Sequence, residues 1–372
     1  MPPGEGIMKS HPATIKDIAK ALGISVSTVS RALKDHPDIS EKTRLIVKEM
    51  AEKLQYKPNA LALSLRSNRT NTIGVIVPEI VHHFFSTVIS GIEDYAYERG
   101  YNVMVCQSNE LQEREAINAQ ALISHRVDGV LISVAKTTQD FSHLQMFLNQ
   151  GVPVVFFDRV CPEIYVDRVI IDDELGGFLV TEHLIKSGCR HIAHFTAPQN
   201  LLIAQGRRAG YERALLQYNL PVRQEMIILC DTYERALEKT GAFLSEHPET
   251  DGIFAVNDST AIGAMQMIRK TGKRIPDDIA VAGFGDGPNA LICTPTLTTV
   301  EQKGYEIGME SVELLIRKIE EKENNISPAP GKEVESVSEK KSVRAQFETK
   351  VIIPNLIVRE STMRSPAVAQ TF

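Results

Sequence analysis

The sequence lacks the features that mark membrane, secreted and metal-bound proteins. No apolar run in its 372 residues approaches the roughly 18 to 20 residues that a membrane span needs, which excludes an integral membrane protein. Residues 1–12 contain no apolar stretch of the kind found in signal peptides, which argues against secretion. The five cysteines are far apart and form no CxxC pair, which argues against a disulfide framework and a structural zinc site. We expect a cytoplasmic protein with reduced thiols and with neither a metal nor another cofactor.

The motifs of several common enzyme classes are absent as well. The sequence contains no P-loop, no GxSxG and no HExxH. It has no repeat of fixed period, which argues against a solenoid. No heptad run follows Val358, which argues against a coiled-coil tetramer. We therefore expect a protein of two or three domains that is not an enzyme.

Charge is distributed unevenly along the chain. The formal net charge is −6 at pH 7, yet basic residues outnumber acidic ones in residues 1–71 and acidic residues dominate the remainder. Only the N-terminal part therefore suits a polyanionic partner such as DNA. The alternative is a chance cluster of charges on a solvated helical surface.

A short helix is predicted to begin after Thr14. The Thr14 side chain can cap the free amides of the first turn, and Asp17 lies three residues later, where a negative charge favours the helix dipole. Gly23 tolerates a left-handed backbone and is expected to end this helix. One apolar face at helical spacing is formed by Ile15, Ile18, Ala19 and Leu22.

A second short helix, with Ser25 as its expected cap, completes a helix-turn-helix pattern. In that motif the first turns of the second helix enter the major groove of DNA. Val26 can contact a thymine methyl group, and Arg31 can bind guanine or a phosphate. The hydroxyl residues allow close approach to DNA, although capping or solvation is their alternative role. The candidate DNA contacts on this helix are Ser25, Val26, Ser27, Thr28, Ser30 and Arg31.

A third helix and a short Ala/Leu segment follow. The third helix is expected from Ser40 and closes a small three-helix core with an apolar stripe of Leu45, Ile46, Met50 and Leu54. After Pro58, Asn59 can cap about two turns of helix, which are marginally stable alone. We expect that segment to become ordered only against a second copy of the chain and DNA.

Together these motifs resemble the lactose-repressor (LacI/GalR) family of transcriptional regulators. The resemblance implies a DNA-binding headpiece (12–58), a hinge helix and linker (59–71) and a body (72–360) similar to periplasmic sugar-binding proteins. It also implies that Leu65 wedges into the minor groove at the operator centre, with an ordinary dimer contact as the alternative. The further candidate DNA contacts are Thr14, Tyr56, Asn59, Ala62 and Leu65. The resemblance is carried by Thr14-Ile15-x-Asp17-Ile18-Ala19, Val29-Ser30-Arg31, Ser40-x-x-Thr43-Arg44, Tyr56-x-Pro58-Asn59 and Ile73-Gly74-Val75.

Apolar runs alternate with helical stretches in the body, which predicts parallel sheets covered on both faces. The expected fold class is α/β, with an all-α helix-turn-helix headpiece followed by a two-lobed body. We expect one lobe from about 72–172 plus 301–322 and the other from about 173–300 plus 350–360. Residues 323–349 are rich in Glu, Lys, Ser, Asn and Pro and are interpreted as a flexible insertion. Strands are predicted at 73–77, 102–106, 130–132, 154–157, 192–195, 253–256 and 279–282.

Polar residues that follow predicted strands are the candidates for a ligand site, because ligands of parallel sheets bind beyond the carboxyl ends of the strands. Asp158 and Asn257 each follow a strand, and Arg207 lies where a loop enters a helix. Such mixed donors and acceptors suit sugar hydroxyls. In the alternative reading, Asp158 caps a turn and Asp258 caps a helix. The family resemblance implies effector-contact positions for Asp158, Arg207 and Asn257.

Two further segments bear on the effector. By resemblance, the loop 78–86 also touches effector, and Phe84 or Phe85 either stacks on a sugar face or packs in the core. The family commonly has an aromatic residue followed by Asp after the strand 279–282, whereas this chain has Gly285 there and Asp286 one residue later. Asp286 is a candidate substitute, but its offset leaves the identity of the effector open.

The sequence thus predicts a homodimeric transcriptional regulator, acting as a repressor on nucleoid DNA. Its expected partners are a near-palindromic double-stranded operator and a small-molecule effector, a sugar or sugar derivative, bound between the lobes. One alternative is a regulator of the same fold whose body binds a protein partner or no effector. A solute-binding protein for a transporter is another, against which the basic N-terminal part argues.

Overall fold

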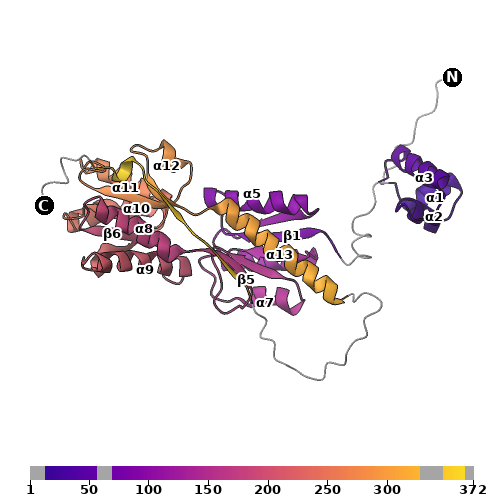
Figure 1. Cartoon of the computed structure of the whole chain (residues 1–372), viewed down its shortest axis with the longest axis horizontal. Helices are drawn as coiled ribbons and strands as arrows, with labels where there is room; N and C mark the ends of the chain where they lie inside the picture. The colour runs from indigo at the N-terminus through magenta and orange to yellow at the C-terminus, as the bar shows by residue number, and fades with distance from the viewer. Residues whose placement is uncertain (1–12, 57–68, 327–346, 365–372) are drawn as a thin grey trace, which may run out of the picture. The chain divides into compact units, whose positions relative to one another are not determined.

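The computed structural model describes residues 13–56, 69–326 and 347–364. The chain divides into two compact units, Met1–Thr70 and Asn71–Phe372 (Figure 1). We call the first unit the head and the second the body. The predicted hinge helix and most of the predicted insertion fall outside the described residues.

The head contains three helices, α1 (Ile15–Leu22), α2 (Val26–Ala32) and α3 (Glu41–Lys53). Local chemistry sets their ends. The backbone N–H and the hydroxyl of Thr14 both donate to the Asp17 carboxylate, at 2.8 and 2.7 Å. Gly23 has a φ of 66°, so α1 ends in the left-handed conformation that favours glycine. The cap predicted at Ser25 is confirmed, and Ser40 caps α3 in the same way, because each hydroxyl accepts the backbone N–H three residues later.

The head core is small and includes one correction. The predicted stripe of α3 was wrong at Leu45 and Ile46, which are 60% and 41% exposed. Val47 and Ala51 are buried instead, because they share one helical face with Met50 and Leu54. Leu45 and Ile46 lie on other sides of the helix and are exposed. The fully enclosed head core consists of Ile18, Ala19, Val29, Ala32, Val47 and Ala51.

The first lobe of the body is built on a six-stranded parallel sheet. Its strand order is β11-β5-β4-β3-β1-β2. Continuous apolar strands such as Val154–Phe157 are buried on both faces, as a parallel sheet requires. The strands are β1 (Thr72–Val77), β2 (Asn102–Gln107), β3 (Gly129–Ile132), β4 (Val154–Phe157), β5 (Asp167–Ile171) and β11 (Thr349–Ile352).

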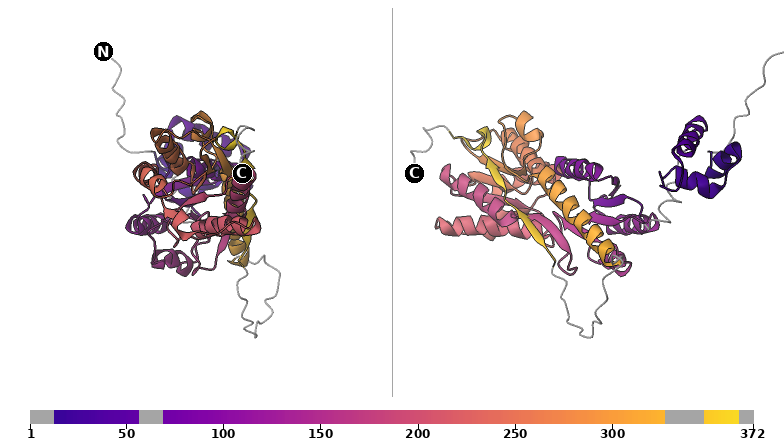
Figure 2. Two further views of the ribbon diagram at one scale, coloured as in Figure 1. Left: turned by 90° about the vertical axis from the view of Figure 1, so that its left-hand side faces the viewer. Right: turned by 45° about the vertical axis from the view of Figure 1, so that its right-hand side comes forward.

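Helices cover both faces of this sheet. Helices α5 (His83–Glu98) and α13 (Gly304–Ile326) pack on one face, and α6 (Gln112–Ser124) and α7 (Ser142–Asn149) on the other. Helices α5 and α13 lie side by side (Figures 1 and 2). Their backbones approach closely at Gly308, where an added Cβ would lie 2.2 Å from the Val88 carbonyl oxygen. Any larger residue at Gly308 would therefore push this helix pair apart.

The second lobe repeats the pattern with strand order β12-β10-β9-β8-β6-β7. Its strands are parallel except for the pair formed by β10 and β12. One face is covered by α8 (Asp173–Lys186) and α9 (Leu202–Gln217), the other by α10 (Tyr233–Glu246) and α11 (Asp258–Lys270). A short helix, α12 (Asn289–Ile292), follows β9. The strands are β6 (Ile192–Thr196), β7 (Ile227–Leu229), β8 (Gly252–Ala255), β9 (Ala280–Gly285), β10 (Thr298–Glu301) and β12 (Asn355–Ile357).

The C-terminal strands differ from the expectation. We assigned 350–360 to the second lobe, but β11 pairs with β5 in the first sheet and only β12 belongs to the second. Pro354 lies between them and cannot donate a ladder hydrogen bond, so one apolar run is split between two sheets. In Figure 1 the yellow chain passes from one lobe to the other at this point.

The α/β class with two parallel-sheet lobes and an N-terminal helical unit is confirmed. Helix α13 continues to Ile326, so the first residues of the predicted insertion are helical. Among the described helices, none is long and apolar enough to cross a membrane.

Candidate functional site

The outer surface of α2 is the candidate DNA-contact surface. Val26 is 41% exposed, and Ser27 and Arg31 are exposed beside it, whereas Thr28 and Ser30 are half-buried. Ser25 is engaged locally: its hydroxyl accepts the Thr28 backbone N–H at 3.1 Å and lies 2.7 Å from the Ser27 hydroxyl. The side chains that the fold leaves outward on α2 are thus an apolar one, a hydroxyl and a guanidinium.

The other candidate DNA contacts in the head are less open. Thr14 is exposed, but both its polar groups already donate to Asp17. Tyr56 is half-buried and packs against the head core. The candidates Asn59, Ala62 and Leu65 lie outside the described residues.

In the body, Arg207 lies at the centre of a buried polar cluster. Its Nε donates to Asp173 Oδ1 and its Nη1 donates to the Val256 carbonyl, both at 2.8 Å. Its guanidinium carbon lies 3.8 Å from the centroid of the Phe284 ring. Only 4% of Arg207 is exposed. The orientation of this guanidinium is therefore fixed from three sides before any ligand binds.

Asp158 approaches the cluster from the other lobe. It follows β4, has a φ of 58° and is 6% exposed. Its Oδ2 accepts the Ser133 hydroxyl at 3.3 Å and lies 3.9 Å from Arg159 Nε. Burial raises the pKa of Asp158, while the positive charges of Arg159 and Arg207 oppose that rise. The carboxylate retains capacity to accept hydrogen bonds from a hydroxyl-bearing ligand.

Asp173 was not predicted as a site residue. Burial raises its pKa to about 6, against the opposing charge and hydrogen bond of Arg207. It lies just after β5, where the same rule about strand ends applies. The signal was missed because β5 begins with the charged pair Asp167 and Arg168 and does not read as an apolar run.

The helix-cap role that the sequence suggested for Asp258 belongs to Asn257. Asn257 is the N-cap of α11: its Oδ1 accepts the Thr260 backbone N–H and its Nδ2 donates to the Asp231 carbonyl, both at 2.8 Å. The cap reading of Asp258 was wrong, because its carboxylate crosses to the end of β9 and accepts the Gly287 N–H at 3.0 Å. Both ends of the Asn257 amide thus already have protein partners.

The segment at the end of β9 explains why an Asp is absent there. Gly285 has a φ of 145°, a conformation that side-chain-bearing residues rarely adopt. A Cβ at Gly285 would also lie 3.2 Å from Asp258 Oδ2, so an Asp would place two carboxylates together. Asp286 instead forms an ion pair with Arg359 at 2.6 Å. The candidate substitute therefore directs its carboxylate to Arg359.

The aromatic pair expected in the loop 78–86 lies in the first turn of α5 and is largely structural. Phe85 is 3% exposed in the core of the first lobe, and Phe84 packs on the same core. Their rings meet edge to face at 5.2 Å, and the Arg159 guanidinium lies 5.8 Å from the Phe85 centroid. Phe85 is therefore a core residue that also supports Arg159.

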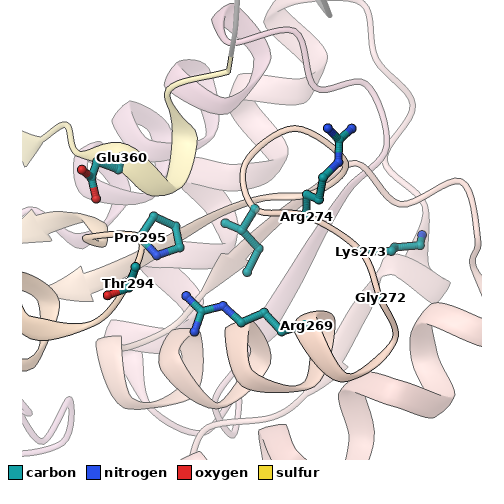
Figure 3. A pocket seen from close by; sticks show the side chains of 8 residues that line it. Arg269, Gly272, Lys273, Arg274, Thr294, Pro295 and Glu360 are labelled. Carbon is teal, nitrogen blue, oxygen red and sulfur yellow. The ribbon is translucent and has the colours of Figure 1, made fainter.

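A surface pocket of the second lobe lies apart from these candidates. It has a volume of about 450 Å³ and adjoins the loop that precedes β9, near the amino ends of the strands. Figure 3 shows Arg269 directed toward Thr294 and Pro295, while Lys273 extends away from them. None of the candidate effector residues lines this pocket.

Comparisons with known proteins match both units. The family model of the lacI family of bacterial regulatory proteins matches residues 14–59, and that of periplasmic binding proteins and the sugar-binding domain of the LacI family matches 70–336. The ribose operon repressor of Halalkalibacterium halodurans is 35% identical over 310 residues, which are 83% of this chain and 91% of that protein. The transcriptional repressor PurR of Vibrio cholerae is 33% identical over 316 residues, covering 84% and 93%.

Solved structures agree with these matches. The Lac repressor dimer bound to operator and the anti-inducer ONPF is 25% identical, with a TM-score of 0.78 over 95% of this chain and 100% of that chain. The complex of the transcriptional regulator CelR with cellobiose is 27% identical, with a TM-score of 0.68 over 94% and 99%. A LacI family regulator from Enterococcus faecium with bound ribose is 26% identical, with a TM-score of 0.64 over 78% and 98%.

Proposed function

Since the chain belongs to the LacI family of bacterial regulatory proteins, we propose that it is a sequence-specific DNA-binding transcription regulator whose operator affinity is modulated by a small-molecule effector. The observation that carries this proposal is the combination of two surfaces in one chain. The head presents the outward side chains of α2, and the body holds a buried Arg–carboxylate cluster at the ends of its strands.

The DNA contacts follow from the exposure of α2. Val26 is suited to a thymine methyl group, and Arg31 to guanine or a phosphate. Because Ser25 is engaged in capping, we assign it to shaping the start of α2, and we propose that the exposed Ser27, whose hydroxyl bonds to Ser25, contacts DNA. Two heads in a homodimer would read two halves of a near-palindromic operator.

The effector contacts follow from the buried cluster. Arg207 donates, Asp158 accepts, and Phe284 offers an apolar ring face beneath the guanidinium. A carbohydrate combines hydroxyl groups with apolar faces, so we propose a sugar or sugar derivative as effector. Asn257 supports this site as the cap of α11, and Phe84 and Phe85 support it through the core.

A second candidate has one observation in its favour. The carboxylate of Asp286 is paired with Arg359, so the second lobe offers fewer acceptors than the resemblance implies. A regulator of the same fold that binds a protein partner, or no effector, is the alternative that this loss favours. In either case we propose a non-enzymatic protein that acts on DNA in the cytoplasm.

The experiment is a selection of bound duplexes from a random DNA pool with the full-length protein, followed by thermal-shift screening against sugars and nucleosides. We expect an inverted repeat to be enriched and at least one sugar to raise the melting temperature and change operator affinity. Failure to enrich any inverted repeat would contradict the DNA-binding proposal. Enrichment without stabilisation by any small molecule would support the protein-partner alternative.

A further inference from the structure

A hydrogen bond joins the two lobes next to the buried cluster. The Asn200 Nδ2 of the second lobe donates to the Lys136 carbonyl of the first lobe at 3.0 Å. Asn200 follows β6, and Lys136 lies in the loop after β3. Both residues lie in loops, and each loop belongs to a different lobe, so the two residues can separate when the lobes move.

The Lys136 side of this contact is rigidly held. The Lys136 backbone N–H donates to Glu110 Oε2 at 2.8 Å, and the Thr137 hydroxyl donates to the Glu110 carbonyl at 2.9 Å. The fully buried Glu115 accepts the Ala135 N–H at 2.6 Å on one oxygen. Its other oxygen accepts the Thr138 hydroxyl at 2.9 Å. The loop therefore presents the Lys136 carbonyl in a fixed position.

The same loop is connected to the candidate effector residue Asp158. Arg159 Nη1 lies 2.8 Å from both carboxylate oxygens of Glu110. Arg159 Nε is buried, makes no hydrogen bond to the described part of the chain and lies 3.9 Å from Asp158 Oδ2. A ligand that binds Asp158 therefore affects the neighbouring Arg159 guanidinium. The other end of that guanidinium is bonded to the Glu110 carboxylate, which accepts the Lys136 N–H.

The Asn200 side is connected to Arg207. Asn200 directly precedes Leu201, the N-cap of α9, and Arg207 lies on that helix. The Gln205 amide donates to the Gln199 carbonyl at 2.7 Å and ties this loop to the first turns of α9. Movement of α9 would therefore displace Asn200 and Arg207 together.

We infer that Asn200 and the Lys136 carbonyl form an interlobe latch that favours the lobe arrangement seen here and thereby sets operator affinity. The expected change in operator affinity rests on the proposed function, whereas the expected change in the distance between the lobes does not. Breaking one net hydrogen bond of about 1 kcal/mol changes the ratio of the two lobe arrangements about five-fold. Asn200 is exposed, so its replacement leaves the cores of both lobes intact.

The test compares Asn200→Asp and Asn200→Ala with the control Gln199→Ala in the full-length protein. Asp has the shape of Asn but replaces the donor with an acceptor facing a carbonyl. The Gln199 side-chain amide, in contrast, donates to Thr196 and Ala197 of its own lobe. Dyes are attached through non-natural amino acids at the exposed Glu113 of α6 and Glu234 of α10, and single-molecule energy transfer reports the distance between the lobes. Operator affinity is measured on the same samples.

We expect both Asn200 variants to lower the ratio of the present lobe distance to all other distances about five-fold, the Asp variant at least as much as the Ala variant. Both variants should change operator affinity in one common direction. Gln199→Ala should match the wild type in both readouts. An unchanged distance distribution in Asn200→Asp would overturn the latch, and so would a changed distribution with unchanged operator affinity. If the wild type binds no operator, the proposed function fails, and the distance measurement alone still decides the latch.

Discussion

Several ionisable side chains are buried in the body. Arg207 and Asp173 are 5% and 10% exposed at their side chains and lie 2.8 Å apart. A buried ion pair adds little net stability, but removal of one partner leaves an uncompensated charge. Asp158 lies close enough to raise the pKa of Asp173 further, and the positive charge of Arg207 opposes the rise in pKa of both carboxylates.

The first prediction concerns this pair. We expect Arg207→Met to lower the free energy of unfolding at pH 7.5 by about 3–5 kcal/mol, because Asp173 stays buried and charged. The double variant Arg207→Met/Asp173→Asn should recover much of that loss. Urea denaturation followed by circular dichroism measures both. Equal stabilities for the single and double variants would show that the pair is not coupled.

His194 predicts a specific acid sensitivity. It is fully buried between Tyr211 and Phe254, and burial lowers its pKa to about 3. In the unfolded chain its pKa is 6.5, so below that value the unfolded state binds one more proton and stability falls as pH falls. Asp173, with its pKa raised to about 6, acts in the opposite direction between its ordinary value of 3.8 and about 6.

The comparison of wild type with His194→Phe isolates the contribution of His194 to the pH dependence of stability, because Asp173 is present in both proteins. On lowering the pH from 7.5 to 5, the wild type should lose about 2 kcal/mol more unfolding free energy than the variant. Urea titrations at a series of pH values provide the measurement. Parallel pH profiles for the two proteins would contradict a neutral buried His194.

Residue roles could be predicted from the sequence only in part. Asp158, expected after a strand end, and Arg207, expected where a loop enters a helix, are both buried, but Arg207 lies within α9 and not at its start. Their contact with an effector stays a prediction. Sequence could not tell that Asn257, and not Asp258, caps α11, because the choice depends on Gly287, distant in the chain. The partner of Asp286 was equally hidden, because Arg359 arrives from the C-terminal segment.

At the scale of elements, local chemistry predicted most ends and long-range pairing decided the rest. The cap at Ser25, the turn at Gly23 and the start of the third helix at Ser40 are local, and they were predicted correctly. The buried face of α3 was predicted incorrectly, because α3 has more apolar residues than one face needs. The sheet that β11 joins was also predicted incorrectly, because a single apolar run can pair with either sheet. Both errors were resolved by packing partners that the sequence does not reveal.

The element that carries the DNA prediction is α2. Arg31→Ala should weaken operator binding about ten-fold, because Arg31 is exposed in the part of α2 expected to face the groove. Lys48→Ala is a matched control: it removes one positive charge of the head, but that charge is already paired with Asp35 at 2.7 Å. Fluorescence anisotropy with the selected operator, measured at several salt concentrations, tests both variants. Equal losses for Arg31→Ala and Lys48→Ala would indicate a general charge effect and would contradict a specific role for α2.

The whole molecule combines units of very different core size. The core of the head has six buried apolar residues, whereas each lobe of the body has two apolar cores around its sheet. Small domains bury a smaller fraction of their surface and are correspondingly less stable. The two compact units should therefore unfold in separate steps, with the head first.

Matched core deletions test this independence. Ile18 of the head and Ile253 of the body are both fully buried, and Ile→Ala substitutions at such sites cost about 2–5 kcal/mol. Ile18→Ala should shift only the lower transition and abolish operator binding at 25 °C, because that cost is a large part of the stability of so small a unit. Ile253→Ala should shift only the upper transition. Calorimetry suits the measurement because the chain contains no tryptophan to report unfolding by fluorescence. A single transition that moves equally in both variants would mean that head and body fold as one cooperative unit, and the head could then not become ordered or disordered by itself in response to the body.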